Sequence, residues 1–259
     1  MGEDLHRLEI EPVERWASRS ADQLAAAVEE SLIERGRCLL ALSGGSTPGP
    51  VLAELATRDI DWKRVTVTQV DERLAPAGSP ARNFTGLLEA FDGLPVAWLP
   101  LPVDKLIPSG GTGAGYDQPD PNDGDGDGGA VEITAGHLGS VLSEFSRRLV
   151  ELADEPPMVD VVQLGLGQDG HTASLLAGDP AVMELRRYVV MTGAYQGFAR
   201  LTMTRPVLDR ARSVIWLVRG LDKAEPLGRL LTGDLSIPAG LIRPRRSLIM
   251  ADADAARQR

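Results

Sequence analysis

His171 is the residue of this sequence best placed to do acid–base chemistry. It is one of three histidines in 259 residues, and it lies in the glycine-rich segment GLGQDGHTAS, soon after the apolar run MVDVVQL. A histidine at the carboxyl end of a buried strand can take a proton from water. We expect a helix to begin here, with an N-terminal dipole that keeps the imidazole neutral. Asp169 either orients His171 or caps that helix, and both roles stay open.

A second segment, SGGSTP at residues 43–48, has the composition of a phosphate-binding loop. Its two glycines let a ligand approach the backbone closely, and the predicted helix that follows offers unpaired N–H groups and the positive end of its dipole. Pro48 suits the first position of that helix, with Thr47 as the N-cap. The alternative is an ordinary strand-to-helix loop. It is not a Walker loop, because no Gly-Lys-Ser/Thr follows.

A third cluster of polar residues follows the predicted strand VTVTQV. It consists of Asp71, Glu72 and Arg73, with Arg82 and Asn83 about ten residues later. Ligands of α/β proteins bind at the carboxyl ends of strands, so this cluster is a candidate part of a site. A solvated charge cluster is the alternative interpretation.

Two other motifs are misleading. The three glycines at 165, 167 and 170 match G-x-G-x-x-G, but no acidic residue ends the next predicted strand, which a dinucleotide site requires. The run Asp123-x-Asp125-x-Asp127-Gly128 resembles a calcium loop, but Thr134 stands where its bidentate glutamate belongs. Loose cation binding by this acidic tract stays open. A single cysteine, Cys38, excludes a multi-cysteine metal site.

The remaining reactive side chains are expected to be structural or solvated. Cys38 lies in the apolar run CLLAL, which favours a buried, inert thiol. His6 belongs to a polar N-terminal stretch, and His137 lies beside a Gly- and Asp-rich tract. We expect both histidines at the surface.

The elements that position these residues alternate along the chain. Helix patterns cover 16–35, from 48 to about 57, 84–91, 138–152 and 222–231, and strand patterns cover 37–42, 65–70, 96–99, 158–164, 188–191, 201–204, 213–218 and 247–250. This alternation predicts an α/β, Rossmann-like fold, in which a largely parallel sheet is flanked by helices in one domain spanning 1–259. Residues 108–130 are dominated by Gly, Asp and Pro, and we expect a flexible acidic insertion there.

Composition excludes several classes of protein. The formal net charge is −10, which argues against binding nucleic acid or an anionic membrane. No apolar run approaches the roughly 20 residues of a membrane span, and the acidic N-terminus has no signal-peptide pattern. We therefore expect a cytoplasmic protein.

Taken together, the motifs resemble the 6-phosphogluconolactonases. The match consists, in order, of SGGSTP, DER, an asparagine about ten residues later, LGLGQDGHTASL, the RLTMT run that begins at Arg200, and RGLDKA, which contains Lys223. The resemblance implies the fold shared with glucosamine-6-phosphate deaminases. It also implies hydrolysis of 6-phospho-D-glucono-1,5-lactone in the oxidative pentose phosphate pathway, with no metal or organic cofactor, by a monomer or a weak homo-oligomer.

The resemblance also implies roles for individual residues. His171 would be the general base, with Asp169 beside it. Arg73 would stabilise the oxyanion or hold the phosphate, and Asp71 and Asn83 would line the sugar pocket. The phosphate would lie on the loop, with Arg200 and Lys223 closing over it; the loop residues are Ser43, Gly44, Gly45, Ser46 and Thr47.

Two alternative functions remain at this point. A glucosamine-6-phosphate deaminase or isomerase places a carboxylate a few residues after its motif histidine, whereas this chain has Leu176 five residues after His171. A non-catalytic sugar-phosphate sensor of the repressor type carries an N-terminal helix-turn-helix, whereas the residues before Arg37 show one long helix pattern.

Overall fold

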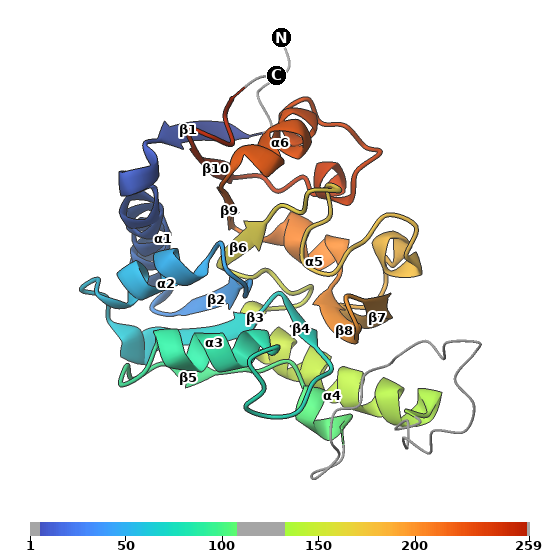
Figure 1. Ribbon diagram of the computed structural model, residues 1–259. Helices are drawn as coiled ribbons and strands as arrows, with labels where there is room; N and C mark the ends of the chain where they lie inside the picture. The colour runs from blue at the N-terminus through green and yellow to red at the C-terminus, as the bar shows by residue number, and fades with distance from the viewer. Residues whose placement is uncertain (1–5, 108–132, 258–259) are drawn as a thin grey trace.

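A parallel sheet of seven strands forms the centre of the molecule in the computed structural model, which describes residues 6–107 and 133–257 (Figure 1). The strand order is β1-β10-β9-β6-β2-β3-β5, and every neighbouring pair is parallel. The strands are β1 (Arg7–Glu11), β2 (Cys38–Leu42), β3 (Val65–Gln69), β5 (Ala97–Trp98), β6 (Val161–Gly165), β9 (Ser213–Val218) and β10 (Ser247–Asp252).

A second sheet is small and antiparallel. It has the order β4-β8-β7, built from β4 (Asp71–Arg73), β7 (Val189–Tyr195) and β8 (Phe198–Met203). β4 begins two residues after β3 ends, so the chain passes directly from the large sheet into the small one. In Figure 1 the label of β4 lies between the large sheet and the β7–β8 hairpin.

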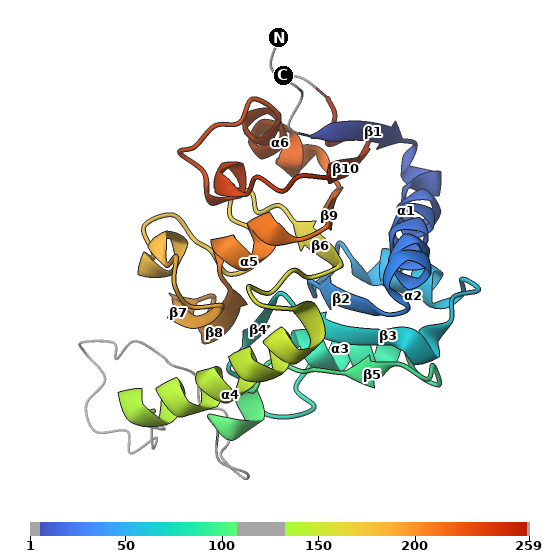
Figure 2. The ribbon, with the colours of Figure 1, turned by 180° about the vertical axis from the view of Figure 1, so that it is seen from behind.

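Helices cover both faces of the large sheet, because its strands are apolar on both sides. One face packs against α1 (Val13–Arg35), α2 (Gly49–Ala56) and α3 (Asn83–Ala90). The other face packs against α4 (Ala135–Ala153), α5 (Arg205–Arg210), α6 (Ala224–Leu231) and the β7–β8 hairpin. The view from behind in Figure 2 shows α4 crossing in front of the sheet on this second face.

The predicted fold class is confirmed, and most predicted elements lie within a few residues of the observed ones. α1 begins at Val13 and ends at Gly36, whose φ of 73° is left-handed, the conformation a C-terminal glycine cap adopts. Cys38 is buried, and desolvation raises the pKa of its thiol to about 12, so it is inert as expected. The expected insertion at 108–130 lies outside the described residues.

Two local predictions are wrong, and the edge strand β1 was not predicted. No helix follows His171: the chain makes turns there, and the next regular element is a 3-10 turn at Pro180–Met183. The segment TASLL has no clear helix start and stop signals, so the sequence does not decide between a helix and turns. Thr47 does not cap α2, whose N-cap position is Pro48 and has no side-chain cap. β1 went unpredicted, since its alternating RLEIE is partly exposed at the edge of the sheet.

His6 is also not a surface residue. It is 6% exposed, its Nδ1 lies 2.6 Å from the Ser247 hydroxyl, and its ring meets Trp216 edge-on. Desolvation, followed by the charge of Arg243, lowers the pKa of His6 from 6.5 to about 4. His6 directly precedes β1, and the parallel pairing of β1 with β10 brings it next to Ser247.

This burial predicts a pH-dependent stability. The unfolded chain binds a proton at His6 below about pH 6.5, whereas the folded chain does so only near pH 4, so acidification favours unfolding. Between pH 7 and pH 4.5 the wild type should lose about 1–2 kcal/mol more of its unfolding free energy than His6→Asn. Urea denaturation at the two pH values measures this difference. Equal losses in both proteins would contradict it.

Candidate active site

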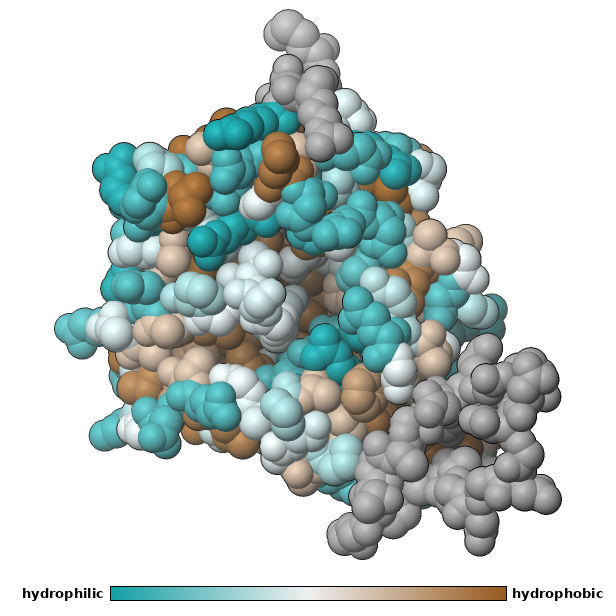
Figure 3. All heavy atoms as spheres, in the orientation of Figure 1, coloured by the Kyte–Doolittle hydropathy of each residue, from teal (hydrophilic) through white to brown (hydrophobic). Residues whose placement is uncertain are grey.

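A polar pocket opens where the strand order changes direction. The chain runs from β2 to β3 on one side and continues through β6, β9 and β10 on the other, so β2 and β6 flank a topological switch point. The loops after β2 and β6 line a pocket of about 460 Å³. The face shown in Figure 3 is hollowed near its centre, with hydrophilic residues around the hollow.

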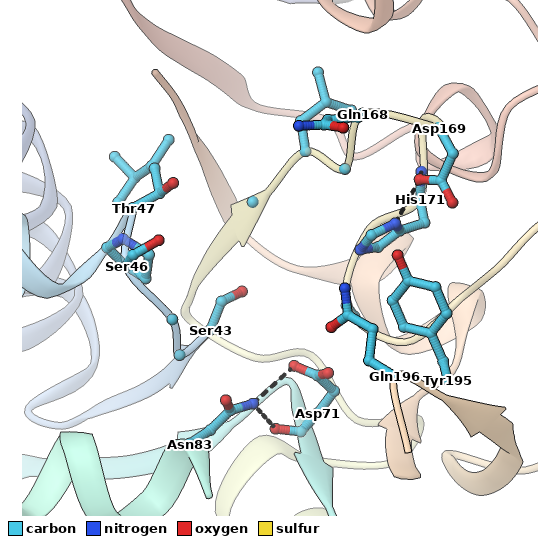
Figure 4. Close-up of a pocket in the computed structure, with 18 of the residues that line it drawn as sticks. Ser43, Ser46, Thr47, Asp71, Asn83, Gln168, Asp169, His171, Tyr195 and Gln196 are labelled. Atoms are coloured by element: carbon cyan, nitrogen blue, oxygen red, sulfur yellow. Dashed lines mark hydrogen bonds and ion pairs between the residues drawn. The ribbon is translucent and has the colours of Figure 1, made fainter. Parts of the chain in front are cut away.

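His171 and Asp169 form a hydrogen-bonded pair at one side of this pocket. Asp169 Oδ1 lies 2.5 Å from Nδ1 of His171 and accepts the backbone N–H of the same residue at 3.1 Å (Figure 4). Although partial burial opposes ionisation, these bonds hold the pKa of Asp169 below its usual value. Of the two roles left open for Asp169, the geometry favours orienting the imidazole, because there is no helix for it to cap.

Glycine at position 167 leaves room for this pair. A Cβ at Gly167 would lie 2.1 Å from Nδ1 of His171 and 2.7 Å from Oδ1 of Asp169. At Gly170, φ is 80° and a Cβ would lie 2.6 Å from Ile237. The glycines that matched a dinucleotide motif therefore let the loop fold tightly around His171.

The loop after β2 lies on the opposite side of the pocket in Figure 4. Ser43 is held at its base, because its N–H donates to Gln163 Oε1 at 3.0 Å and its hydroxyl donates to the Gln163 carbonyl at 3.1 Å. Gly45 has a φ of 103°, which favours glycine. Ser46 is exposed and Thr47 is half-buried, so their hydroxyls are accessible at the start of α2.

Asp71 and Asn83 form the floor of the pocket between these two sides. Asn83 Nδ2 donates to the backbone oxygen of Asp71 at 2.8 Å and to its Oδ1 at 3.2 Å (Figure 4). The hydroxyl of Ser174 donates to the other carboxylate oxygen of Asp71 at 2.5 Å. A Cβ at Gly44 would collide with Asn83 Oδ1 at 2.3 Å, so the loop after β2 packs directly on this group.

Glu72 anchors that floor from below. It is fully buried, and its carboxylate accepts four hydrogen bonds of 2.7–2.9 Å. The donors are the side-chain amide of Gln69 and three backbone N–H groups, those of Arg73, Asn83 and Phe84. Burial raises the pKa of Glu72, and the four donors oppose that rise by stabilising the carboxylate.

Four cationic side chains line the pocket: Arg73, Arg200, Arg219 and Lys223. The register of β4 and β8 sets Arg73 directly opposite Arg200, an arrangement of like charges that costs energy without an anion between them. Arg200 is 4% exposed, its nearest carboxylate contact is 3.8 Å to Asp71, and its buried Nε has no partner among the described residues. Burial, partly offset by Asp71, lowers the pKa of this guanidinium.

All twelve residues proposed from the sequence line this one pocket. Sequence reasoning missed Arg219, Gln168, Tyr195 and Gln196, which also line it. Arg219 was within the quoted RGLDKA motif and could have been found there. Tyr195 and Gln196 lie at the tip of the β7–β8 hairpin, and only the pairing of those strands brings them to the site.

Within residues 6–107 and 133–257, no group of three or more His, Cys, Asp or Glu side chains is arranged to hold a metal ion. In the same ranges, no helix has the length and apolar character needed to cross a membrane.

The network around Glu72 predicts a large effect of a small change. Glu72→Gln replaces an acceptor oxygen by a donor and leaves at least one buried N–H group unpaired, which should cost about 1–3 kcal/mol of unfolding free energy. The matched control is Glu89→Gln, because Glu89 is exposed on the same helix α3, and its change should be near zero. Urea denaturation measures both. Equal effects would show that the four hydrogen bonds contribute little.

Comparisons with known proteins agree with this arrangement. A family model described as "Glucosamine-6-phosphate isomerases/6-phosphogluconolactonase" matches residues 12–251. A 6-phosphogluconolactonase of Synechocystis is 31% identical over 86% of this chain and 84% of its own length. One from Streptomyces coelicolor is 32% identical over 95% of this chain and 91% of its own.

Solved structures share the fold. The 6-phosphogluconolactonase of Trypanosoma brucei has a TM-score of 0.77 at 22% identity, and the alignment covers 97% of each chain. That of Thermotoga maritima has a TM-score of 0.75 at 21% identity, covering 95% of this chain and 99% of the other. Because the family model spans nearly the whole sequence, this chain belongs to the glucosamine-6-phosphate isomerase/6-phosphogluconolactonase family.

Proposed function

We propose that this chain hydrolyses 6-phospho-D-glucono-1,5-lactone to 6-phosphogluconate, with His171 as the general base. One observation carries the proposal: an Asp169–His171 pair faces the same pocket as a glycine- and hydroxyl-rich loop at a helix start. A base at one side and an anion-binding loop at the other suit an ester that carries a distant phosphate. The relatives named 6-phosphogluconolactonase support the same reaction.

The base acts through the ring nitrogen that Asp169 does not hold. Asp169 accepts the Nδ1 proton, which leaves Nε2 of His171 as the acceptor of a proton from water. The water oxygen then bonds to the lactone carbonyl carbon, and a negative charge develops on the carbonyl oxygen. When the bond to the ring oxygen breaks, His171 returns the proton to that oxygen, and the product is the open-chain acid.

The cationic side chains of the pocket contact two groups of the substrate: the phosphate, and the carbonyl oxygen on which negative charge develops. The phosphate lies on the residues of the loop, Ser43, Gly44, Gly45, Ser46 and Thr47, where the free N–H groups of α2 point. Lys223 contributes a positive charge to phosphate binding. Its Nζ lies 3.5 Å from Oδ2 of Asp222. Arg200 has spare donors beside the ring of Tyr195, which itself contacts His171. Arg73 lies opposite Arg200, between the carbonyl end and the phosphate end.

Asp71 and Asn83 bind hydroxyl groups of the sugar ring. Asp71 is buried and already accepts hydrogen bonds from Ser174 and Asn83, which fix its orientation. The amide oxygen of Asn83 lies next to Gly44, at the border between the sugar and the phosphate loop. A fixed acceptor of this kind selects the positions of the hydroxyl groups.

The deaminase alternative finds little support in the lining of the pocket. Among the described residues that line it, the carboxylates are Asp71 and Asp169. A third carboxylate after the histidine, which the deaminases use for ring opening, does not line it: position 176 is leucine. The assay below therefore includes glucosamine 6-phosphate as a second substrate.

The proposal is tested with freshly generated 6-phosphogluconolactone. The purified protein should consume it far faster than spontaneous hydrolysis, without added metal, while leaving glucosamine 6-phosphate unchanged. His171→Ala should lower kcat by about 10²–10⁴-fold because the general base is lost. Asp169→Asn should lower kcat less, since the base remains but its tautomer is no longer fixed.

Two results would overturn this mechanism. A folded His171→Ala variant with full activity would remove the histidine from the reaction. A wild-type protein that binds 6-phosphogluconate but has no activity would point to a sugar-phosphate sensor instead.

The close approach at Gly167 gives an independent prediction. In Gly167→Ala the new methyl group would lie within 2.1 Å of Nδ1 of His171 and must displace the imidazole. A displacement of about 1 Å should lower kcat by about 10²-fold and leave KM nearly unchanged. The control is Gly228→Ala, an exposed helical position with nothing within 4 Å of the added Cβ, which should keep full activity. Equal kcat values for the two variants would show that this approach does not position the base.

A further inference from the structure

The ring of Tyr195 lies between the two groups that the proposed reaction needs most. The centres of the Tyr195 and His171 rings are 5.5 Å apart, with an interplanar angle of 69°. The guanidinium carbon of Arg200 lies 5.0 Å from the centre of the same ring, within cation–π range. Figure 4 shows Tyr195 beside His171, on the side of the pocket away from Ser46 and Thr47.

The hairpin tip that carries Tyr195 is a tight two-residue turn. The next residue, Gln196, has a φ of 51°, and Gly197 has a φ of 80°, which is the geometry of a type I′ turn. The β7–β8 pairing shifts register between Thr192 and Tyr195. This turn sets Tyr195 and Gln196 in the lining of the pocket.

Arg200 and the hairpin tip hold each other. One terminal nitrogen of Arg200 donates to the backbone oxygen of Tyr195 at 3.3 Å and to Gln196 Oε1 at 3.4 Å. The ion pair between Arg200 and Asp71 is 3.8 Å long. Since these contacts are long, the face of the Tyr195 ring offers a further surface against which the guanidinium lies.

The contribution of Tyr195 comes from its ring. Within the described residues its hydroxyl makes no hydrogen bond, so no fixed partner shares or receives its proton. The ring, in contrast, packs edge-on against the His171 imidazole, whose Nδ1 is held by Asp169. The Tyr195 ring thus contacts both the base, His171, and the buried cation, Arg200.

We propose that Tyr195 is a positioning residue whose ring sets the orientation of His171 and Arg200 relative to each other. This inference rests on the proposed function, in which His171 is the base and Arg200 contacts an anionic group of the substrate. A change at Tyr195 then acts on two kinetic constants, through the base on kcat and through the cation on KM.

The test compares three variants of the full chain. Tyr195→Ala removes the ring, and Tyr195→Phe keeps the ring and removes the hydroxyl. Tyr188→Ala is the matched control, because Tyr188 is an aromatic residue at the base of the same hairpin and lines a different pocket. Thermal denaturation of each variant reports on folding.

With the lactone as substrate, Tyr195→Ala should lower kcat by about 10–100-fold and raise KM by about two- to tenfold. Tyr195→Phe should restore both constants to within about threefold of the wild type, because the ring positions both groups. A Tyr195→Ala variant as active as Tyr188→Ala would overturn the inference. So would a Tyr195→Phe variant as impaired as Tyr195→Ala, since the hydroxyl would then carry the effect.

A second measurement separates this inference from the proposed function. The ¹H and ¹⁵N signals of the His171 ring should be sharp in the wild type and in Tyr195→Phe, and broadened by exchange between ring orientations in Tyr195→Ala. This readout needs no turnover. A wild type without lactonase activity would refute the proposed function, whereas equally sharp His171 signals in the wild type and Tyr195→Ala would refute the positioning role alone.

Discussion

The site depends on one carboxylate that has no access to water. Glu72 accepts hydrogen bonds from β3, from β4 and from the first residues of α3. A buried carboxylate with four donors is stable only while all of them are in place, so it fixes their relative positions. Asp71 precedes it, Arg73 follows it, and Asn83 donates to it. Their placement in the pocket follows from this constraint.

The pocket is a joint product of the two sheets. The large sheet contributes the loop after β2, the Asp169–His171 pair after β6 and Lys223 after β9, because adjacent parallel strands end at the same edge. The small sheet contributes Asp71, Arg73, Arg200 and the hairpin tip. In the proposed reaction the large sheet supplies the base and the phosphate loop, while the small sheet supplies contacts to the sugar and to the reacting carbonyl.

Much of this arrangement could be predicted from the sequence. Buried parallel strands are short apolar runs, so β2, β6 and β9 could be predicted from the sequence. The glycines and polar residues that follow these strands indicated the site. The pairing of β4 with β8 could not be predicted, because a three-residue strand of charged residues has no hydrophobic pattern. The position of Tyr195 depends on that pairing. The helix expected after His171 is replaced by a turn, in which the Leu175 N–H donates to the Thr172 carbonyl.

The division of the site between two sheets has a consequence for its thermal behaviour. β8 is buried in the core on the second face of the large sheet, whereas the tip of the hairpin is partly exposed, so the tip belongs to the part of a fold that opens at low free-energy cost. An opening of the tip would carry Tyr195 away from His171, while the seven parallel strands and their helices stay folded. Loss of activity on heating would then begin below the temperature at which the whole chain unfolds.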